Sequence, residues 1–291
     1  MTWISQDEVA GVQDCTVFPD SYSRVSRAFV LGSSLIVGGA GGLVLRGLPD
    51  LAAGLWGVIG AAAFAGGLLS TWSPCGYSSI SLLRPTGRGM RALRDWMPTF
   101  AAHGAGYAVG ALALGALLGG IGALLGFSGL ATGPGLAVLA LIGLVYGAHQ
   151  LDFLRVPYPQ RRAQVPHDAR QRFPKWVVGG LYGLSLGLDY LTYVQTPLLY
   201  LATAAAILTG NFAEAIAIVA IFNLGRFLPV AVNLFPVTDY AIQAWLGRHQ
   251  ERAAICDGAI LMALLALVLL TPSILWVWAD AVLAMMGNDL P

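Results

Sequence analysis

A cysteine lies at a predicted helix break inside an apolar run. The segment Ser73-Pro74-Cys75-Gly76-Tyr77 interrupts the hydrophobic stretch 51–83. Pro74 removes a backbone N–H donor and Gly76 adds freedom, so we expect the helix to open and release carbonyls that need partners inside the protein. Cys75 is therefore a candidate redox thiol, with Pro74 and Gly76 as parts of its site. A packed thiol at a simple kink fits the same pattern.

A second apolar run, 176–208, is interrupted in the same way. An offset of 120 residues carries Cys75 to position 195, inside a polar stretch with no thiol. The candidate counterparts there are Tyr193, Gln195, Thr196 and Pro197. Their side chains can hydrogen-bond a ligand or the other half of the chain, but they cannot exchange disulfides.

Two ionisable residues, Asp189 and Arg226, each lie about 14 residues into consecutive runs that cross in opposite directions. Charges at membrane depth are costly and usually face a partner inside the protein, so we predict an ion pair. A site charge and a purely structural pair that fixes helix register both fit. Asn223 is a further polar residue of the same run. His103, near the start of its own run, fits either a proton relay or a packing role.

The other cysteines, Cys15 and Cys256, are far from Cys75 along the chain, and no C-x-x-C pair occurs. The spacing therefore predicts neither a zinc site nor a local disulfide. We expect no metal and no cofactor. Both outer cysteines fit inert thiols, and Cys15, in the N-terminal tail, is the better candidate of the two for a redox partner.

The composition predicts an all-α polytopic membrane protein. Hydrophobic residues make up 57% of the 291 residues and charged residues only 11%, against about 25% charged in soluble domains. The charges are dispersed over loops, so no nucleic-acid surface is expected and the bilayer is the main surrounding. Acidic residues precede the first apolar run, which does not fit a cleaved signal peptide.

Seven apolar runs are long enough to cross a bilayer. They lie at 28–45, 51–83, 98–126, 130–151, 176–208, 213–236 and 254–278. With seven spans, every strongly basic loop falls on one side and every neutral or acidic loop on the other. We therefore expect a multi-pass protein of the bacterial inner membrane, with the N-terminus cytoplasmic and the C-terminus periplasmic.

The two interrupted runs are each followed by two ordinary spans, which predicts two inverted three-helix repeats with broken first helices. The expected organisation has six parts. They are a cytoplasmic tail (1–27), an extra transmembrane helix with a short periplasmic loop (28–50), the first repeat (51–151), a basic loop (152–175), the second repeat (176–278) and a periplasmic tail (279–291). Glycines four residues apart predict close helix packing at Gly106 and Gly110, at Gly115 and Gly119, and along Gly179, Gly183 and Gly187.

The run 222–229 resembles the aromatic-x-Leu-Gly-x-x-Leu-Pro signature of the transmembrane thiol-disulfide carriers of cytochrome c biogenesis, the family of CcdA and the central domain of DsbD. Ser73-Pro74-Cys75 resembles the Pro-Cys at that family's first broken helix, and Gly210-Asn211 fits as well. The resemblance implies two inverted units that each supply one cysteine and carry electrons from a cytoplasmic thioredoxin-like protein to periplasmic thiols. Only Cys75 matches an active cysteine, and Ser78 replaces the second Pro of the family's motif.

The extra N-terminal helix and the missing second cysteine are similar to the membrane accessory proteins of methylamine utilisation. That likeness implies a role in the maturation, by disulfide handling or export, of periplasmic methylamine dehydrogenase, with periplasmic or membrane maturation proteins as partners. Any catalysis would be thiol-disulfide exchange through one cysteine. The alternatives are an electron carrier for cytochrome c biogenesis, and a small-molecule transporter or a scaffold without redox chemistry. Asp189, Arg226, Gln195 and Asn223 would line the transporter's cavity.

Overall fold

The computed structural model describes residues 21–85, 87, 89–160 and 172–271. The predicted N-terminal tail with Cys15, the middle of the basic loop, and the end of the last span with the C-terminal tail lie outside these residues. The described chain is helical, and no strand occurs within it. Its elements are α2 (Arg24–Arg46), α3 (Leu51–Leu69), η1 (Ser70–Trp72), α4 (Pro74–Leu82), α5 (Met90–Leu124), α6 (Gly133–Gln150), α8 (Lys175–Gly187), α9 (Leu198–Leu208), α10 (Phe212–Phe227), η2 (Leu228–Leu234) and α11 (Asp239–Leu269).

Six of the described helical segments are long and apolar enough to cross a membrane, as expected for a multi-pass membrane protein. The predicted span 176–208 is not one of them, because it consists of α8 and α9, of 13 and 11 residues, joined by the non-helical linker 188–197. A single crossing helix needs about 20 residues. The number of apolar runs therefore exceeds the number of continuous spanning helices in the described chain.

Two helices begin earlier than their apolar runs. α5 begins at Met90 rather than at residue 98, with Pro98 inside it, and α11 begins at Asp239 rather than at residue 254. Arg248, which precedes the predicted apolar run 254–278, lies within α11. Hydropathy identifies only the part of a helix that can lie in lipid. α11 begins earlier, at its N-cap Thr238, and its first turns consist largely of polar residues that the hydropathy pattern leaves out.

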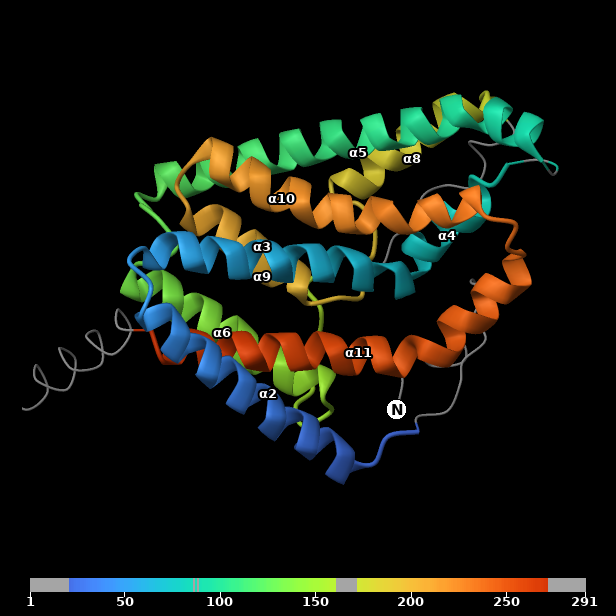
Figure 1. The fold of residues 1–291 in the computed structure, drawn as a ribbon. Coiled ribbons are helices and arrows are strands. Elements are labelled where there is room, and N and C mark those ends of the chain that lie inside the picture. The colour runs from blue at the N-terminus through green and yellow to red at the C-terminus, as the bar shows by residue number, and fades with distance from the viewer. Residues whose placement is uncertain (1–20, 86, 88, 161–171, 272–291) are drawn as a thin grey trace, which may run out of the picture.

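The helices lie side by side (Figure 1). α8 packs on α5, α5 on α10, and α10 on α3, while α11 packs between α2 and α6. The short connections 47–50, 125–132 and 209–211 lie together at one end of the molecule, at the left in Figure 1. α2, α5, α8 and α11 begin at the opposite end.

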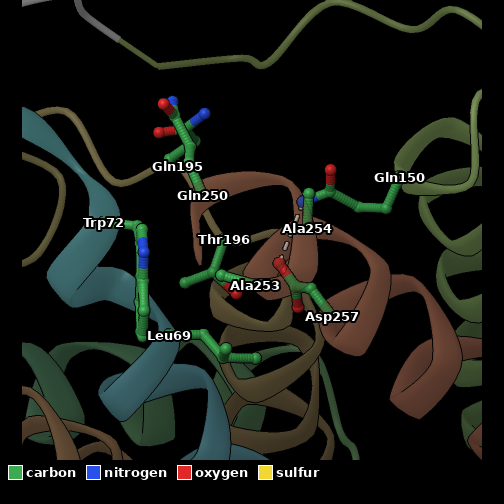
Figure 2. Close-up of a pocket in the computed structure, with 9 residues that line it drawn as sticks. All are labelled: Leu69, Trp72, Gln150, Gln195, Thr196, Gln250, Ala253, Ala254 and Asp257. Atoms are coloured by element: carbon green, nitrogen blue, oxygen red, sulfur yellow. Dashed lines mark hydrogen bonds between the residues drawn. The ribbon is translucent and has the colours of Figure 1, made fainter. Parts of the chain in front are cut away.

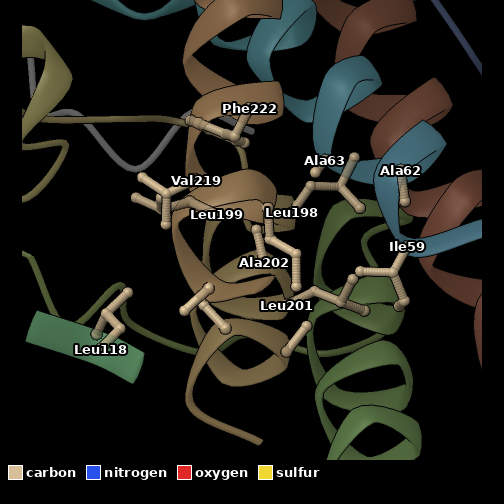
Figure 3. Close-up of a cluster of buried hydrophobic side chains, with 14 of the residues drawn as sticks. Ile59, Ala62, Ala63, Leu118, Leu198, Leu199, Leu201, Ala202, Val219 and Phe222 are labelled. Atoms are coloured by element: carbon tan, nitrogen blue, oxygen red, sulfur yellow. The ribbon is translucent and has the colours of Figure 1, made fainter. Parts of the chain in front are cut away.

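The main hydrophobic core is built around α9, which contacts α3, α5, α6 and α10. Figure 3 shows its leucines between the small residues of α3 and the side chains of α10. Leu198 and Ala205 are fully buried. An apolar helix enclosed on all sides in this way requires apolar residues around its whole circumference, which α9 has.

The predicted glycine packing is present. A Cβ atom on Gly106 would lie 2.3 Å from the carbonyl oxygen of Gly180, and one on Gly183 would lie 2.1 Å from that of His103, so only glycine allows α5 and α8 this close approach. Gly115 and Gly119 make similar contacts with α10.

Candidate functional site

The first break is the start of a new helix. η1 extends α3 to Trp72, and Ser73 then adopts an extended conformation as the N-cap of α4. Its Oγ accepts a hydrogen bond from the Gly76 amide at 3.3 Å and donates one to the Ser70 carbonyl at 2.5 Å. Pro74 occupies the first helical position, where its missing N–H costs nothing. The predicted opening of the helix at Pro74 is therefore present, and Ser73 caps the new helix.

Hydroxyl groups close to the first break satisfy its carbonyls. Ser70 Oγ donates to the Gly67 carbonyl and Thr71 Oγ1 to the Leu68 carbonyl, each at 2.6 Å. Ser79 Oγ donates to the Gly76 carbonyl at 2.8 Å. The hydroxyl side chains in this apolar run thus serve as hydrogen-bond donors to its own backbone carbonyls.

Cys75 lies in the first turn of α4 and is 1% exposed. It belongs to a cluster with Tyr107 of α5, Tyr182 and Leu186 of α8, and Phe227 of α10. The thiol is therefore enclosed where three other helices meet, next to the break that the sequence predicts.

His103 lies on α5 one turn before Tyr107 and is fully buried. Its Nδ1 is 2.9 Å from the Gly179 carbonyl oxygen, and its ring packs edge-on against Tyr107 at 5.0 Å. Nε2 of His103 and the Tyr107 hydroxyl are buried and make no hydrogen bond within the described chain. The structure therefore places His103 against the cluster around Cys75, through Tyr107.

The second break is longer and more polar. α8 ends at Gly187, and Asp189 then adopts the left-handed conformation (φ 50°), which Asp tolerates better than most residues. The linker continues in non-helical form until α9 begins at Leu198. Thr196 Oγ1 accepts a hydrogen bond from the Leu198 amide at 3.3 Å.

The predicted ion pair is present at this break. Arg226 Nη1 lies 2.9 Å from Asp189 Oδ1, with side chains 0% and 1% exposed. Arg226 also donates to the Leu186 carbonyl at 2.8 Å and to Thr192 Oγ1 at 3.1 Å. Asn223 donates to the Gly187 carbonyl and to Asp189 Oδ2, both at 3.2 Å. Arg226 and Asn223 of α10 therefore bind the last carbonyl groups of α8, and both also contact the carboxylate of Asp189.

Gln160, which the sequence did not single out, closes the other side of the linker. Its side-chain amide donates to the Val194 carbonyl at 3.0 Å and accepts from the Val194 amide at 2.8 Å, and it also donates to the Tyr200 hydroxyl at 2.7 Å. The backbone amide of Gln160 donates to the Tyr158 carbonyl at 2.8 Å, and the Tyr158 ring packs edge-on against that of Tyr193. No pattern in the sequence around Gln160, a glutamine in a basic loop, predicts that its side chain contacts residues more than 30 positions away.

Gln195 and Cys75 do not occupy equivalent positions in the structure. Cys75 is the second residue of α4, whereas Gln195 precedes α9 in the linker. Counted from the cap at Pro197, the residue that corresponds to Cys75 is Leu199. The offset of 120 residues taken from the sequence leads to Gln195, whereas the helix starts align Cys75 with Leu199. The two offsets differ because the second break contains more residues than the first.

A small pocket, partly open to solvent, lies where η1, the linker and α11 meet (Figure 2). It is lined by Leu69, Trp72, Gln150, Gln195, Thr196, Gln250, Ala253, Ala254 and Asp257. Of the residues predicted to line a cavity, Gln195 does so, whereas Asp189, Arg226 and Asn223 are not part of this pocket. Asp257 escaped notice because its apolar run begins at residue 254, which places it at a helix end.

The described residues contain no group of three or more His, Cys, Asp or Glu side chains that could hold a metal ion. Among these residues the two breaks offer one buried thiol, one buried ion pair, the buried carboxylate of Asp257, and neutral hydrogen-bonding groups.

Fold and site together define a multi-pass helical membrane protein with two interrupted helices and buried polar groups at both interruptions. The chain is 73% identical over 253 residues to the methylamine utilization protein MauF of Paracoccus versutus, covering 87% of this chain and 90% of that protein. It is 57% identical over 253 residues to MauF of Methylorubrum extorquens, covering 87% and 88%. It is 49% identical over 260 residues to MauF of Methylophilus methylotrophus, covering 89% and 91%.

The chain therefore belongs to the MauF family. No family model matches the sequence. No solved structure matches it either.

Proposed function

We propose that this chain is a membrane accessory protein of methylamine utilisation that rearranges disulfides in a periplasmic enzyme, methylamine dehydrogenase, through Cys75. The observation that carries the proposal is the position of Cys75 in the first turn of a short helix at a break in the bundle. Relatives named for methylamine utilisation support the pathway.

Disulfide exchange through one cysteine needs no external oxidant or reductant, because the number of disulfide bonds does not change. The Cys75 thiolate attacks a disulfide of the client protein, a new S–S bond forms, and the other client sulfur leaves as a thiolate that takes up a proton. A second client thiolate then attacks the mixed disulfide and releases Cys75. The client disulfide is rearranged, and no net electrons move.

The buried state of Cys75 requires α4 to move before a client can react. Among the described residues, α4 is held by hydrogen bonds and apolar packing: Asn233 donates to the Ile80 carbonyl at 2.9 Å, Gln243 donates to the Tyr77 hydroxyl, and Ile80 and Cys75 pack in apolar clusters. The first break can therefore open without separating a buried ion pair.

We also propose that α8, the linker and α9 together make a seventh crossing, in two inverted three-helix repeats. Reciprocal packing supports this topology: Gly67 of α3 meets Gly225 of α10, and Gly187 of α8 meets Gly110 of α5. Basic residues at the starts of α2, α5 and α8, which lie at one end, favour a cytoplasmic N-terminus in the inner membrane.

An electron carrier of the cytochrome c biogenesis type would need a second thiol near Cys75. Within the described chain the other cysteine is Cys256, exposed on α11. A disulfide isomerase that borrows the resolving thiol from its client suits this arrangement better.

The test is complementation of a strain that lacks the gene, scored by growth on methylamine. We expect Cys75→Ser to abolish growth, and Cys256→Ser to support it. A variant that keeps only Cys75 should form a mixed disulfide with a client, visible on non-reducing gels and absent after reduction.

Full growth with Cys75→Ser, together with no mixed disulfide, would overturn the proposal. A scaffold would then explain the protein better, and the sensitive positions would lie in α2 and the basic loop.

A further inference from the structure

A buried carboxylate in the pocket beside the second break has no cationic partner among the residues that the structure describes. Asp257 is 2% exposed. Its Oδ2 accepts a hydrogen bond from Gln150 Nε2 at 2.9 Å. Its Oδ1 faces Thr196 and the Leu198 amide but makes no hydrogen bond of normal geometry within the described chain. We propose that this pocket binds a small primary ammonium ion.

The charge balance of the pocket favours a cation. None of the described residues that line it is Lys or Arg, and Asp257 is the one ionisable group among them. A buried carboxylate is costly unless it is paired with a positive charge. Asp189, the other acid buried at this break, already has Arg226. Within the described part of the chain, Asp257 therefore differs from Asp189 in having no positively charged partner, which a bound ligand would supply.

The neutral lining residues suit N–H donors attached to a small apolar group. Gln195 and Gln250 lie together at one side of the pocket, and Asp257 lies at the other (Figure 2). Their amide oxygens and the Asp257 carboxylate are acceptors for an ammonium group. Trp72 uses its indole N–H on the Leu246 carbonyl, so its ring carbons remain to contact an alkyl group or a cation.

The charge of the site favours a small, singly charged ligand. One carboxylate matches one positive charge, and the described chain offers no cluster of ligands for a divalent metal. The pocket is small and partly open to solvent, so an ion of very few non-hydrogen atoms suits it best. Methylammonium is the smallest alkylammonium ion and is the probe of choice.

The first experiment is calorimetric titration of the detergent-solubilised full chain with methylammonium chloride. We expect saturable binding, and Asp257→Asn should weaken it about tenfold or more, because a charge-assisted contact is lost. Asp95→Asn, which removes an exposed carboxylate on α5, is the matched control and should leave binding unchanged. Cys75→Ser should also bind normally, which separates this proposal from the thiol chemistry.

The second experiment places a tethered ammonium in the pocket. Ala254 lines it and lies three residues before Asp257 on α11, so a lysine there reaches the carboxylate along the helix face. We expect Ala254→Lys to lose methylammonium binding and to unfold at a higher temperature than Ala254→Met. The difference should vanish when Asp257→Asn is added.

Three results would overturn the proposal. They are the absence of methylammonium binding to the unaltered chain, equal binding to Asp257→Asn, and equal competition by sodium ions or by neutral acetamide. The lysine variant keeps the test decisive if Asp257→Asn fails to fold, because Ala254→Lys retains the carboxylate.

Discussion

The two breaks satisfy their open backbone groups in different ways. At the first, hydroxyls within a few residues, such as Ser70 and Ser73, bond the nearby carbonyls. At the second, Arg226 and Asn223 reach across from α10, and Gln160 reaches in from the basic loop. The backbone groups opened at the first break are therefore satisfied locally, whereas those at the second are satisfied by side chains from other elements. We expect the first break to move more readily than the second, which holds helices in place.

The largest effect should come from separating the ion pair of the second break. Asp189→Ala or Arg226→Ala leaves the opposite charge buried, and each should lower the free energy of unfolding by about 3–5 kcal/mol. The double variant should cost less than the sum of the two. Reversible unfolding in mixed detergent micelles measures all three.

A matched control for the ion pair is Arg84→Ala. Arg84 and Asp239 form a partly exposed ion pair at 2.5 Å, and such pairs contribute only about 0–1 kcal/mol. If the double variant lost as much free energy of unfolding as the two single variants together, the contact between Asp189 and Arg226 would contribute nothing. The second break would then have no stabilising ion pair that the first one lacks.

The pair of Asp189 and Arg226 was predictable from the sequence because a charge at membrane depth needs a partner, and each is the one opposite charge at equal depth in an adjacent span. The opening at Pro74 was predictable because proline has a defined effect on a helix. The length of the second linker was not, since an apolar linker and an apolar helix have the same hydropathy. Gln160 and Asp257 were missed because their positions depend on tertiary contacts that no local pattern records.

A smaller effect should follow from adding a methyl group at the first break. A Cβ on Gly76 would lie 2.5 Å from the Ser70 carbonyl oxygen and 2.8 Å from Thr71 Cα, both backbone atoms that cannot easily shift. Gly76→Ala should therefore cost about 1–3 kcal/mol, as overpacking does. It should also speed alkylation of Cys75, measured with a membrane-permeant maleimide.

Gly57→Ala is the control for that substitution. A Cβ at Gly57 of α3 meets nothing within 4 Å, so alanine should be neutral or slightly stabilising there. Unchanged alkylation of Cys75 in Gly76→Ala would show that the first break does not govern access to the thiol.

The smallest effect should come from the helix caps. Ser73→Ala removes the cap of α4 and should cost about 1 kcal/mol, while Thr196→Val removes the Thr196 hydrogen bond to the Leu198 amide at similar cost. The two should differ in reactivity: Ser73→Ala should raise the alkylation rate of Cys75, and Thr196→Val should not. Equal rates in both variants would remove the distinction between a movable and a fixed break.

The enclosure of α9 has a consequence for biosynthesis. With 11 residues it is too short to enter a bilayer as an independent segment. Three of the helices it contacts, α3, α5 and α6, precede it along the chain and are therefore synthesised first. The nascent first half thus forms a template into which α9 inserts, and α10 then completes the enclosure from the remaining side.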